Sequence, residues 1–299
     1  MKYLLIFAAL ILFGCEPIEI TADIPKTKPK IVADGVFSPD SVWTVKLSLS
    51  QHVLNKETEY DLLGDNEVKS VTIKDENNKL IESLRRVKGS DKNLHYRGQT
   101  APEINKIYRI EIQTNSYGTV TASDAAPPSA PIASARVDST RQENTGNGKI
   151  VHVEFSDDGN TADYYEIYII GYEKYVDYHY DFDSDKLIKG KTKREYRIAR
   201  FTIDDPAYEN RIVDDKKLIV EDALFNGQKA TFKLKMESYR MVLTQVILRH
   251  VSADFYKFVV SQKTQKESDG PFSEPVFIQG NVQDGFGIFA GYSVSVHQL

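Results

Sequence analysis

Residues 43–49, Trp43-Thr44-Val45-Lys46-Leu47-Ser48-Leu49, place a large apolar side chain at every second position and a polar one between. Successive side chains of an extended strand point to opposite faces, so this spacing buries one face and leaves the other in water. The same alternation recurs in residues 108–112 and 151–155. The pattern predicts a mainly all-β protein built from half-buried strands.

The first half of the chain has the strand spacing of an immunoglobulin-like domain. Residues 30–124 contain about seven short strand candidates. Polar turns separate them, among them residues 75–78 and 115–118, and no stretch shows helical periodicity. We therefore expect an immunoglobulin-like β-sandwich over residues 30–124.

Residues 125–131, Ala-Ala-Pro-Pro-Ser-Ala-Pro, interrupt the strand pattern. Proline lacks the N–H that a central strand needs and favours stiff extended backbone. We expect a linker here, followed by a larger β-sandwich domain over residues 132–299. One helix is expected within it, near residues 253–266, with Ser252 as its N-cap and an apolar stripe that packs onto the sheet.

The N-terminus has the features of a lipoprotein export signal. A single Lys2 precedes a short apolar run that ends at Leu12-Phe13-Gly14-Cys15, and Cys15 is the only cysteine of the chain. The run is too short for a membrane-spanning helix, and a lone cysteine in an exported chain has no disulfide partner within that chain. We predict a signal peptide over residues 1–14, lipidation at Cys15 and a proline-containing tether over residues 15–29. The alternative is a plain signal peptide with an incidental cysteine.

The charge balance makes nucleic acid an improbable partner. The chain carries 38 basic and 43 acidic residues, a net charge of −5, mixed along its length. Nucleic-acid-binding domains instead concentrate basic residues on one face. The predicted partner is the membrane, through the lipid on Cys15.

A tyrosine-rich segment is the strongest candidate for recognition. Tyrosine combines a flat apolar ring with a polar tip, which suits sugar stacking and protein recognition, although tyrosine also simply prefers strands. At period two, Tyr164 and Tyr168 share a face opposite Tyr165, so the segment cannot bury all its rings on one side. We expect Tyr172, Tyr175 and Tyr178 to bind a ligand or partner. The seven tyrosines are residues 164, 165, 168, 172, 175, 178 and 180.

Local patterns of catalysis or metal binding are weak. Residues 181–185, Asp-Phe-Asp-Ser-Asp, open like an EF-hand loop, but Lys186 replaces the required glycine and Thr192 the bidentate glutamate. The six histidines show no i, i+4 pair, and no Gly-x-Ser-x-Gly elbow occurs. We predict no catalytic, metal or cofactor site and no enzymatic activity.

Residues 281–292, Asn-Val-Gln-Asp-Gly-Phe-Gly-Ile-Phe-Ala-Gly-Tyr, with the preceding Gly270-Pro271-Phe272-Ser273-Glu274-Pro275, resemble the C-terminal signature of a known family. Together with the lipobox, residues 31–35 and the proline junction, they are similar to the domain-of-unknown-function 4249 family of Bacteroidota outer-membrane lipoproteins. The resemblance implies a setting beside TonB-dependent transporters and carries no established activity. Within the signature, Gly285, Gly287 and Gly291 suit positive φ or close backbone approach, so we expect a structural role; the alternative is docking of a partner.

We therefore expect a lipid-anchored, surface-exposed, non-enzymatic outer-membrane protein, acting as an accessory or ligand-binding subunit of a TonB-dependent transporter β-barrel. The first alternative is a free-standing surface protein that binds a glycan or another protein. The second is an envelope hydrolase whose site is assembled from distant residues.

Overall fold

The computed structural model describes residues 28–51, 62–142, 146–182, 185–238, 240–268 and 276–299. Cys15, the predicted signal peptide 1–14 and all but the last two residues of the predicted tether 15–29 lie outside the described residues. No helix among the described residues combines the length and the apolar character that a membrane crossing requires.

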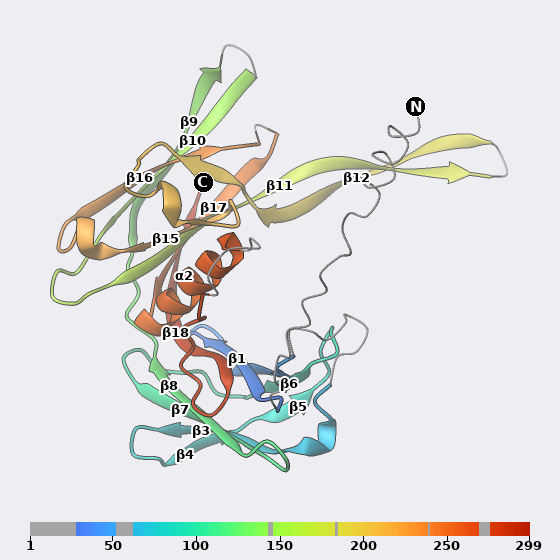
Figure 1. The fold of residues 1–299 in the computed structure, drawn as a ribbon. Helices are drawn as coiled ribbons and strands as arrows, with labels where there is room; N and C mark the ends of the chain where they lie inside the picture. The colour runs from blue at the N-terminus through green and yellow to red at the C-terminus, as the bar shows by residue number, and fades with distance from the viewer. Residues whose placement is uncertain (1–27, 52–61, 143–145, 183–184, 239, 269–275) are drawn as a thin grey trace, which may run out of the picture.

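The N-terminal half is a sandwich of two sheets (Figure 1). One face is ordered β1-β2-β6-β5 and the other β4-β3-β7-β8. With the strands lettered in chain order, these are the A-B-E-D and C′-C-F-G sheets of an immunoglobulin-like sandwich, which confirms the predicted architecture. The strands are β1 (Ile31–Phe37), β2 (Thr44–Leu49), β3 (Val68–Asp75), β4 (Leu80–Ser83), β5 (Arg85–Val87), β6 (Leu94–Arg97), β7 (Ile107–Thr114) and β8 (Thr119–Ala125).

Aromatic residues fill the centre of this first sandwich. The Trp43 ring lies 5.1 Å from Phe37 and 4.9 Å from Tyr108, centroid to centroid. Tyr108 stands at the start of β7, and its hydroxyl accepts a hydrogen bond from the Glu103 backbone N–H at 3.0 Å. This is the tyrosine corner of immunoglobulin-like domains, in which a buried ring ties the approach of strand F to the core.

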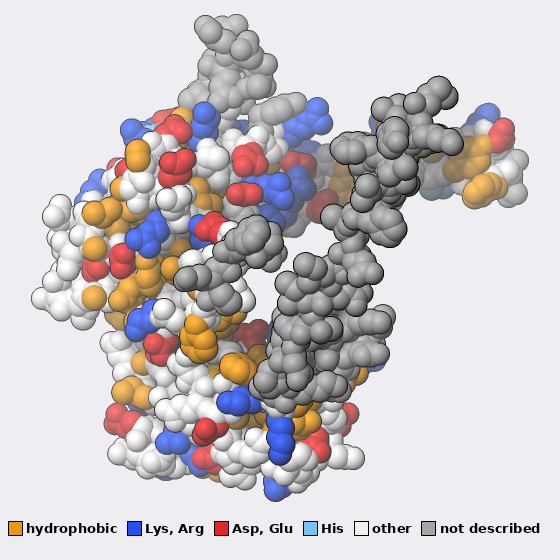
Figure 2. All heavy atoms as spheres, in the orientation of Figure 1, with side chains coloured by type: hydrophobic (Ala, Val, Ile, Leu, Met, Phe, Trp, Pro, Cys, Tyr) orange, Lys and Arg blue, Asp and Glu red, His pale blue; other side chains and the backbone are white. Residues whose placement is uncertain are grey.

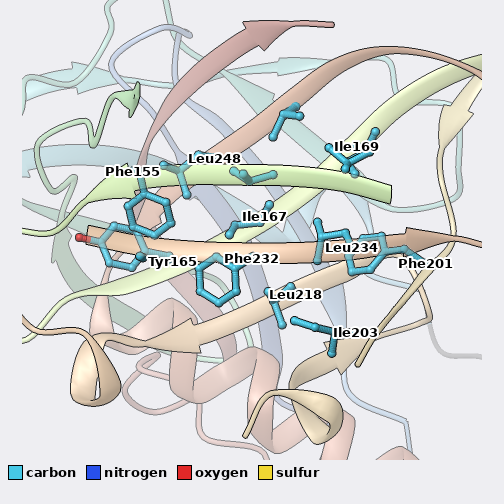
Figure 3. Close-up of a cluster of buried hydrophobic side chains, with 14 of the residues drawn as sticks. Phe155, Tyr165, Ile167, Ile169, Phe201, Ile203, Leu218, Phe232, Leu234 and Leu248 are labelled. Carbon is cyan, nitrogen blue, oxygen red and sulfur yellow. The ribbon is translucent and has the colours of Figure 1, made fainter. Parts of the chain in front are cut away.

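The C-terminal half is a second sandwich, and its core is shown in Figure 3. The sheet β13-β16-β10-β9 faces the strands β14-β15-β11-β17, and Phe155, Tyr165 and Phe232 lie between them. The chain passes from one sheet to the other between β12, which ends at Ile198, and β13, which begins at Phe201. The strands are β9 (Ile132–Gln142), β10 (Gly146–Ser156), β11 (Tyr164–Asp181), β12 (Lys186–Ile198), β13 (Phe201–Ile203), β14 (Ile212–Val213), β15 (Lys217–Glu221), β16 (Lys229–Met236), β17 (Val242–Val251) and β18 (Phe286–Gln298).

The last strand joins the two halves. β18 pairs in parallel with β1, from Val32↔Phe286 to Phe37↔Gly291, and antiparallel with β17 along its second part. One ten-stranded sheet therefore crosses the molecule, and Phe289 packs in the N-terminal core. The predicted division into residues 30–124 and 132–299 did not include this sharing of β18.

The one α-helix among the described residues, α2 (Ala253–Glu267), lies in the angle between the two halves (Figure 1). The Ser252 hydroxyl accepts a hydrogen bond from the Phe255 N–H at 3.2 Å, as expected for an N-cap. Phe255 and Tyr256 are buried against Ile288 and Ala290 of β18, and the Tyr256 ring lies 4.7 Å from Tyr164. The predicted packing of this helix onto the sheet is confirmed. Three short 3₁₀ helices, η1 (Asp65–Glu67), η2 (Glu209–Arg211) and η3 (Asp222–Leu224), complete the described elements.

Candidate recognition arm and neighbouring clusters

The tyrosine-rich segment forms a projecting hairpin, which we call the arm (residues 172–182 and 185–197). β11 is paired with β15 as far as Tyr168 and with β17 as far as Tyr172; beyond that point its only partner among the described residues is β12. Gly171 stands where the arm begins, at a register shift, and a Cβ there would lie 2.6 Å from the Val242 carbonyl oxygen. The hairpin leaves the body as an extended two-stranded ribbon (Figure 1).

The arm exposes apolar side chains that nothing among the described residues covers. Phe182 at its tip is 87% exposed, Leu187 63% and Tyr178 54%. Figure 2 shows these hydrophobic side chains gathered toward the end of the arm. An isolated two-stranded ribbon is marginally stable in water, and clustered exposed apolar groups mark interaction sites. The further large apolar side chains exposed on the arm are Tyr175, Tyr180, Ile188 and Tyr196.

The three predicted binding tyrosines do not share one face. Alternation along β11 puts Tyr172 and Tyr178 on one face and Tyr175 on the other. The Tyr172 ring is half-buried, because it lies 5.2 Å from Tyr196 and the Arg194 guanidinium stands 4.9 Å from its centroid. A flat partner on the first face would therefore meet Tyr178 together with Leu187, and would not reach Tyr175.

Ion pairs and a hydrogen bond brace the two strands of the arm. Lys193 Nζ lies 2.6 Å from Asp177, and this hydrogen bond lowers the pKa of the Asp177 carboxyl. At the base, Glu173 accepts from Arg197 at 2.6 Å and from Ser238 at 2.8 Å, and both donors lower its pKa. Near the tip the Tyr180 hydroxyl donates to Asp185. Asp183 and Ser184 of the EF-hand-like stretch 181–185 lie outside the described residues.

A buried acidic cluster lies at the other end of β11, next to its first residues. Asp157, Asp163 and Asp222 bring one carboxylate oxygen each to within 4.8 Å of one another. The Tyr165 hydroxyl donates to Asp157 at 2.6 Å, and the Gly227 N–H donates to its second oxygen at 2.8 Å. Burial, and then the hydrogen bond to Asp157, raise the pKa of Tyr165. Oxygen ligands of this kind suit a hard cation, but protein N–H and O–H groups already bond to these carboxylates.

His250 connects this cluster to the linker. One ring nitrogen, Nε2, lies 3.0 Å from Asp163, and the other, Nδ1, lies 2.8 Å from the Pro128 carbonyl oxygen. The Asp163 backbone N–H also donates to Asp222 at 2.9 Å. Local spacing could not predict these contacts of His250, because its partners are separated from it by 87 and 122 positions in the chain. The arrangement connects Pro128 of the predicted linker to β17 of the second sandwich.

Among the described residues of the C-terminal signature, Asn281, Gly287 and Gly291 make structural contacts. The Asn281 side chain bonds to both backbone groups of Phe289, at 2.8 and 2.9 Å. Gly287 has φ 104°, and a Cβ there would lie 2.0 Å from the Ala33 carbonyl oxygen of β1; at Gly291 it would lie 2.4 Å from that of Ala125. The signature therefore lets β18 approach the backbone of the first sandwich closely, as the sequence predicted for these glycines.

Fold and surface together define a protein of two joined β-sandwiches that carries a projecting two-stranded arm. The family described as Domain of unknown function (DUF4249) matches residues 18–298, and the chain belongs to this family. The resemblance expected from the signature is thereby confirmed. No curated protein matches the chain.

Proposed function

We propose that this chain is a lipid-anchored, non-enzymatic outer-membrane protein that acts as an accessory or ligand-binding subunit of a TonB-dependent transporter. The lipobox pattern ending at Cys15 supports the anchor, and residues 15–29 would hold the folded part away from the membrane surface. Anchoring requires at least two acyl chains, since one myristoyl-sized chain binds a membrane only reversibly.

The observation that carries the proposal is the arm. From the base of the arm its β11 strand runs for ten residues, Tyr172 to Asp181, about 33 Å at the rise of an extended strand. A ribbon of this length with exposed rings on it gains stability when a second surface covers those rings. A neighbouring membrane protein held in the same bilayer supplies such a surface at high effective concentration.

Co-purification from native membranes tests the partnership. We expect the full-length chain, extracted in mild detergent, to retain a transporter β-barrel that mass spectrometry identifies. Replacing Cys15 with Ala should release the chain from the membrane fraction and lower the recovery of the barrel. Repeated purification of correctly anchored protein without any β-barrel would refute the transporter role.

A free-standing binder is the second candidate, favoured by the polar tips of the exposed arm tyrosines. Tyrosine rings of this kind also stack on sugars. Binding to a glycan array or to a soluble protein, lost when Tyr175 or Tyr178 is replaced by Ala, would support that reading. Because the two tyrosines occupy opposite faces of β11, the separate variants also identify the face that binds.

A further inference from the structure

A pocket opens at the base of the arm, between the end of β12, the turn that precedes β15 and the loop that follows β16. Its volume is about 780 Å³, which falls in the range of small-molecule sites. Ile198 and the buried Met241 give it an apolar wall. The pocket lies outside the exposed face of the arm that carries Tyr178.

The lining of this pocket is strongly cationic. It contains four basic residues, Arg197, Arg200, Lys216 and Arg240, and one acidic residue, Glu237. The whole chain has a net charge of −5, so the excess of positive charge is local. Figure 2 shows Lys and Arg side chains close together where the arm meets the body.

The basic side chains differ in what holds them. Arg197 is fixed by Glu173 at 2.6 Å, and the same carboxylate accepts from Ser238, another lining residue. For Arg200 and Lys216, by contrast, no carboxylate lies within ion-pair distance among the described residues. Counting Glu173, the pocket still carries four positive and two negative groups. A concave site lined mainly by positive charge has a strong positive electrostatic potential, which favours a ligand with more than one negative group.

We propose that this pocket binds a small organic polyanion, a molecule with two or more carboxylate or phosphate groups. A guanidinium group presents a fork of N–H donors that matches the two oxygens of a carboxylate or phosphate, and Lys216 adds a point charge. The apolar wall of Ile198 and Met241 fits the carbon skeleton that joins the anionic groups. The inference does not depend on the transporter partnership, because the lining residues named here all belong to this chain.

Titration calorimetry of the purified full chain with citrate and with inorganic pyrophosphate tests the site. We expect binding that weakens as salt is added, and that weakens about tenfold or more in Arg200→Glu/Lys216→Glu, the effect of losing one hydrogen bond to a charged group. The matched control is Lys69→Glu/Lys88→Glu, which changes the net charge equally at exposed positions outside the pocket and should bind as the unmodified chain does.

Vesicles containing phosphatidylglycerol form a second arm of the experiment. Binding to these vesicles alone, with the same dependence on Arg200 and Lys216, would assign the site to a lipid phosphate in place of a soluble anion. If the charge-reversed variant fails to fold, Arg200→Gln/Lys216→Gln replaces it and should show the same loss. The proposal is overturned if neither anion nor vesicle binds at millimolar ligand, or if the pocket and control variants lose binding equally.

Discussion

Gly287 offers a quantitative test of how β18 joins the two halves. A methyl group at this position would lie 2.0 Å from the Ala33 carbonyl oxygen and 2.8 Å from its carbon, both of them backbone atoms of the paired strand β1. Gly287→Ala therefore requires β1 and β18 to move apart, and it also places a non-glycine residue at φ 104°. The strained dihedral costs about 1–3 kcal/mol and the forced displacement about 1–3 kcal/mol more.

Gly118 supplies the control for the dihedral alone. It has φ 77° in the turn between β7 and β8, and nothing lies within 4 Å of the Cβ position. Gly118→Ala should therefore lower the free energy of unfolding by about 1–2 kcal/mol, from backbone strain without any clash.

Urea unfolding followed by tryptophan fluorescence compares the two variants, because Trp43 lies in the core that both changes affect. We expect Gly287→Ala to be the less stable by at least about 1 kcal/mol. Equal destabilisation by the two substitutions would refute close backbone approach as the reason for glycine at position 287.

Three further results are expected. Burial raises the pKa of the Asp124 carboxyl above its ordinary value of 3.8, so the stability that Asp124 contributes is complete below pH 3.8 and is lost as pH rises through the folded pKa. The Asp124→Asn side chain can still accept a hydrogen bond from the Gly291 N–H. By thermal denaturation this variant should be more stable than the unmodified chain at pH 7, and the gain should vanish toward pH 4. Tyr165→Phe removes the hydroxyl that donates to buried Asp157 and should lower the free energy of unfolding in urea by about 1–3 kcal/mol. Tyr96→Phe loses no hydrogen bond among the described residues and should change that free energy by less than about 0.5 kcal/mol; equal losses would contradict the role of the Tyr165 bond. Cys15→Ala should move the chain from the membrane to the soluble fraction on fractionation, and persistence in the membrane would exclude lipid anchoring at this residue.

Period-two alternation predicted most of the strands because each buries one face on a core. The alternating residues 43–49 contain β2 (Thr44–Leu49), and the helix expected near residues 253–266 ends one residue later. Local spacing was informative here because every second residue of β2, namely Val45, Leu47 and Leu49, packs inward.

Long-range pairings could not be predicted in this way. β18 lies beside β1, and Val32 pairs with Phe286 across most of the chain length. The continuation of β11 past Gly171 could not be predicted, because residues 172–181 are largely exposed and do not bury apolar side chains at every second position. The cationic pocket could not be predicted from local spacing either, because Arg200, Lys216 and Arg240 come from separate segments that only the fold brings together.

The central proposal is that the arm binds a membrane partner, and we expect the contact on the face where the exposed Tyr178 and Leu187 lie together. Its most direct test is quantitative mass spectrometry of proteins that co-purify with the full-length anchored chain, compared between two double variants. Tyr178→Asp/Leu187→Asp places charge on that face, while Leu80→Asp/Ile81→Asp places the same charge on β4, where Leu80 is 55% exposed against 54% for Tyr178. The proposal predicts that a transporter β-barrel is recovered with the unmodified chain and the β4 variant and is lost with the arm variant; equal recovery with all three chains would contradict it.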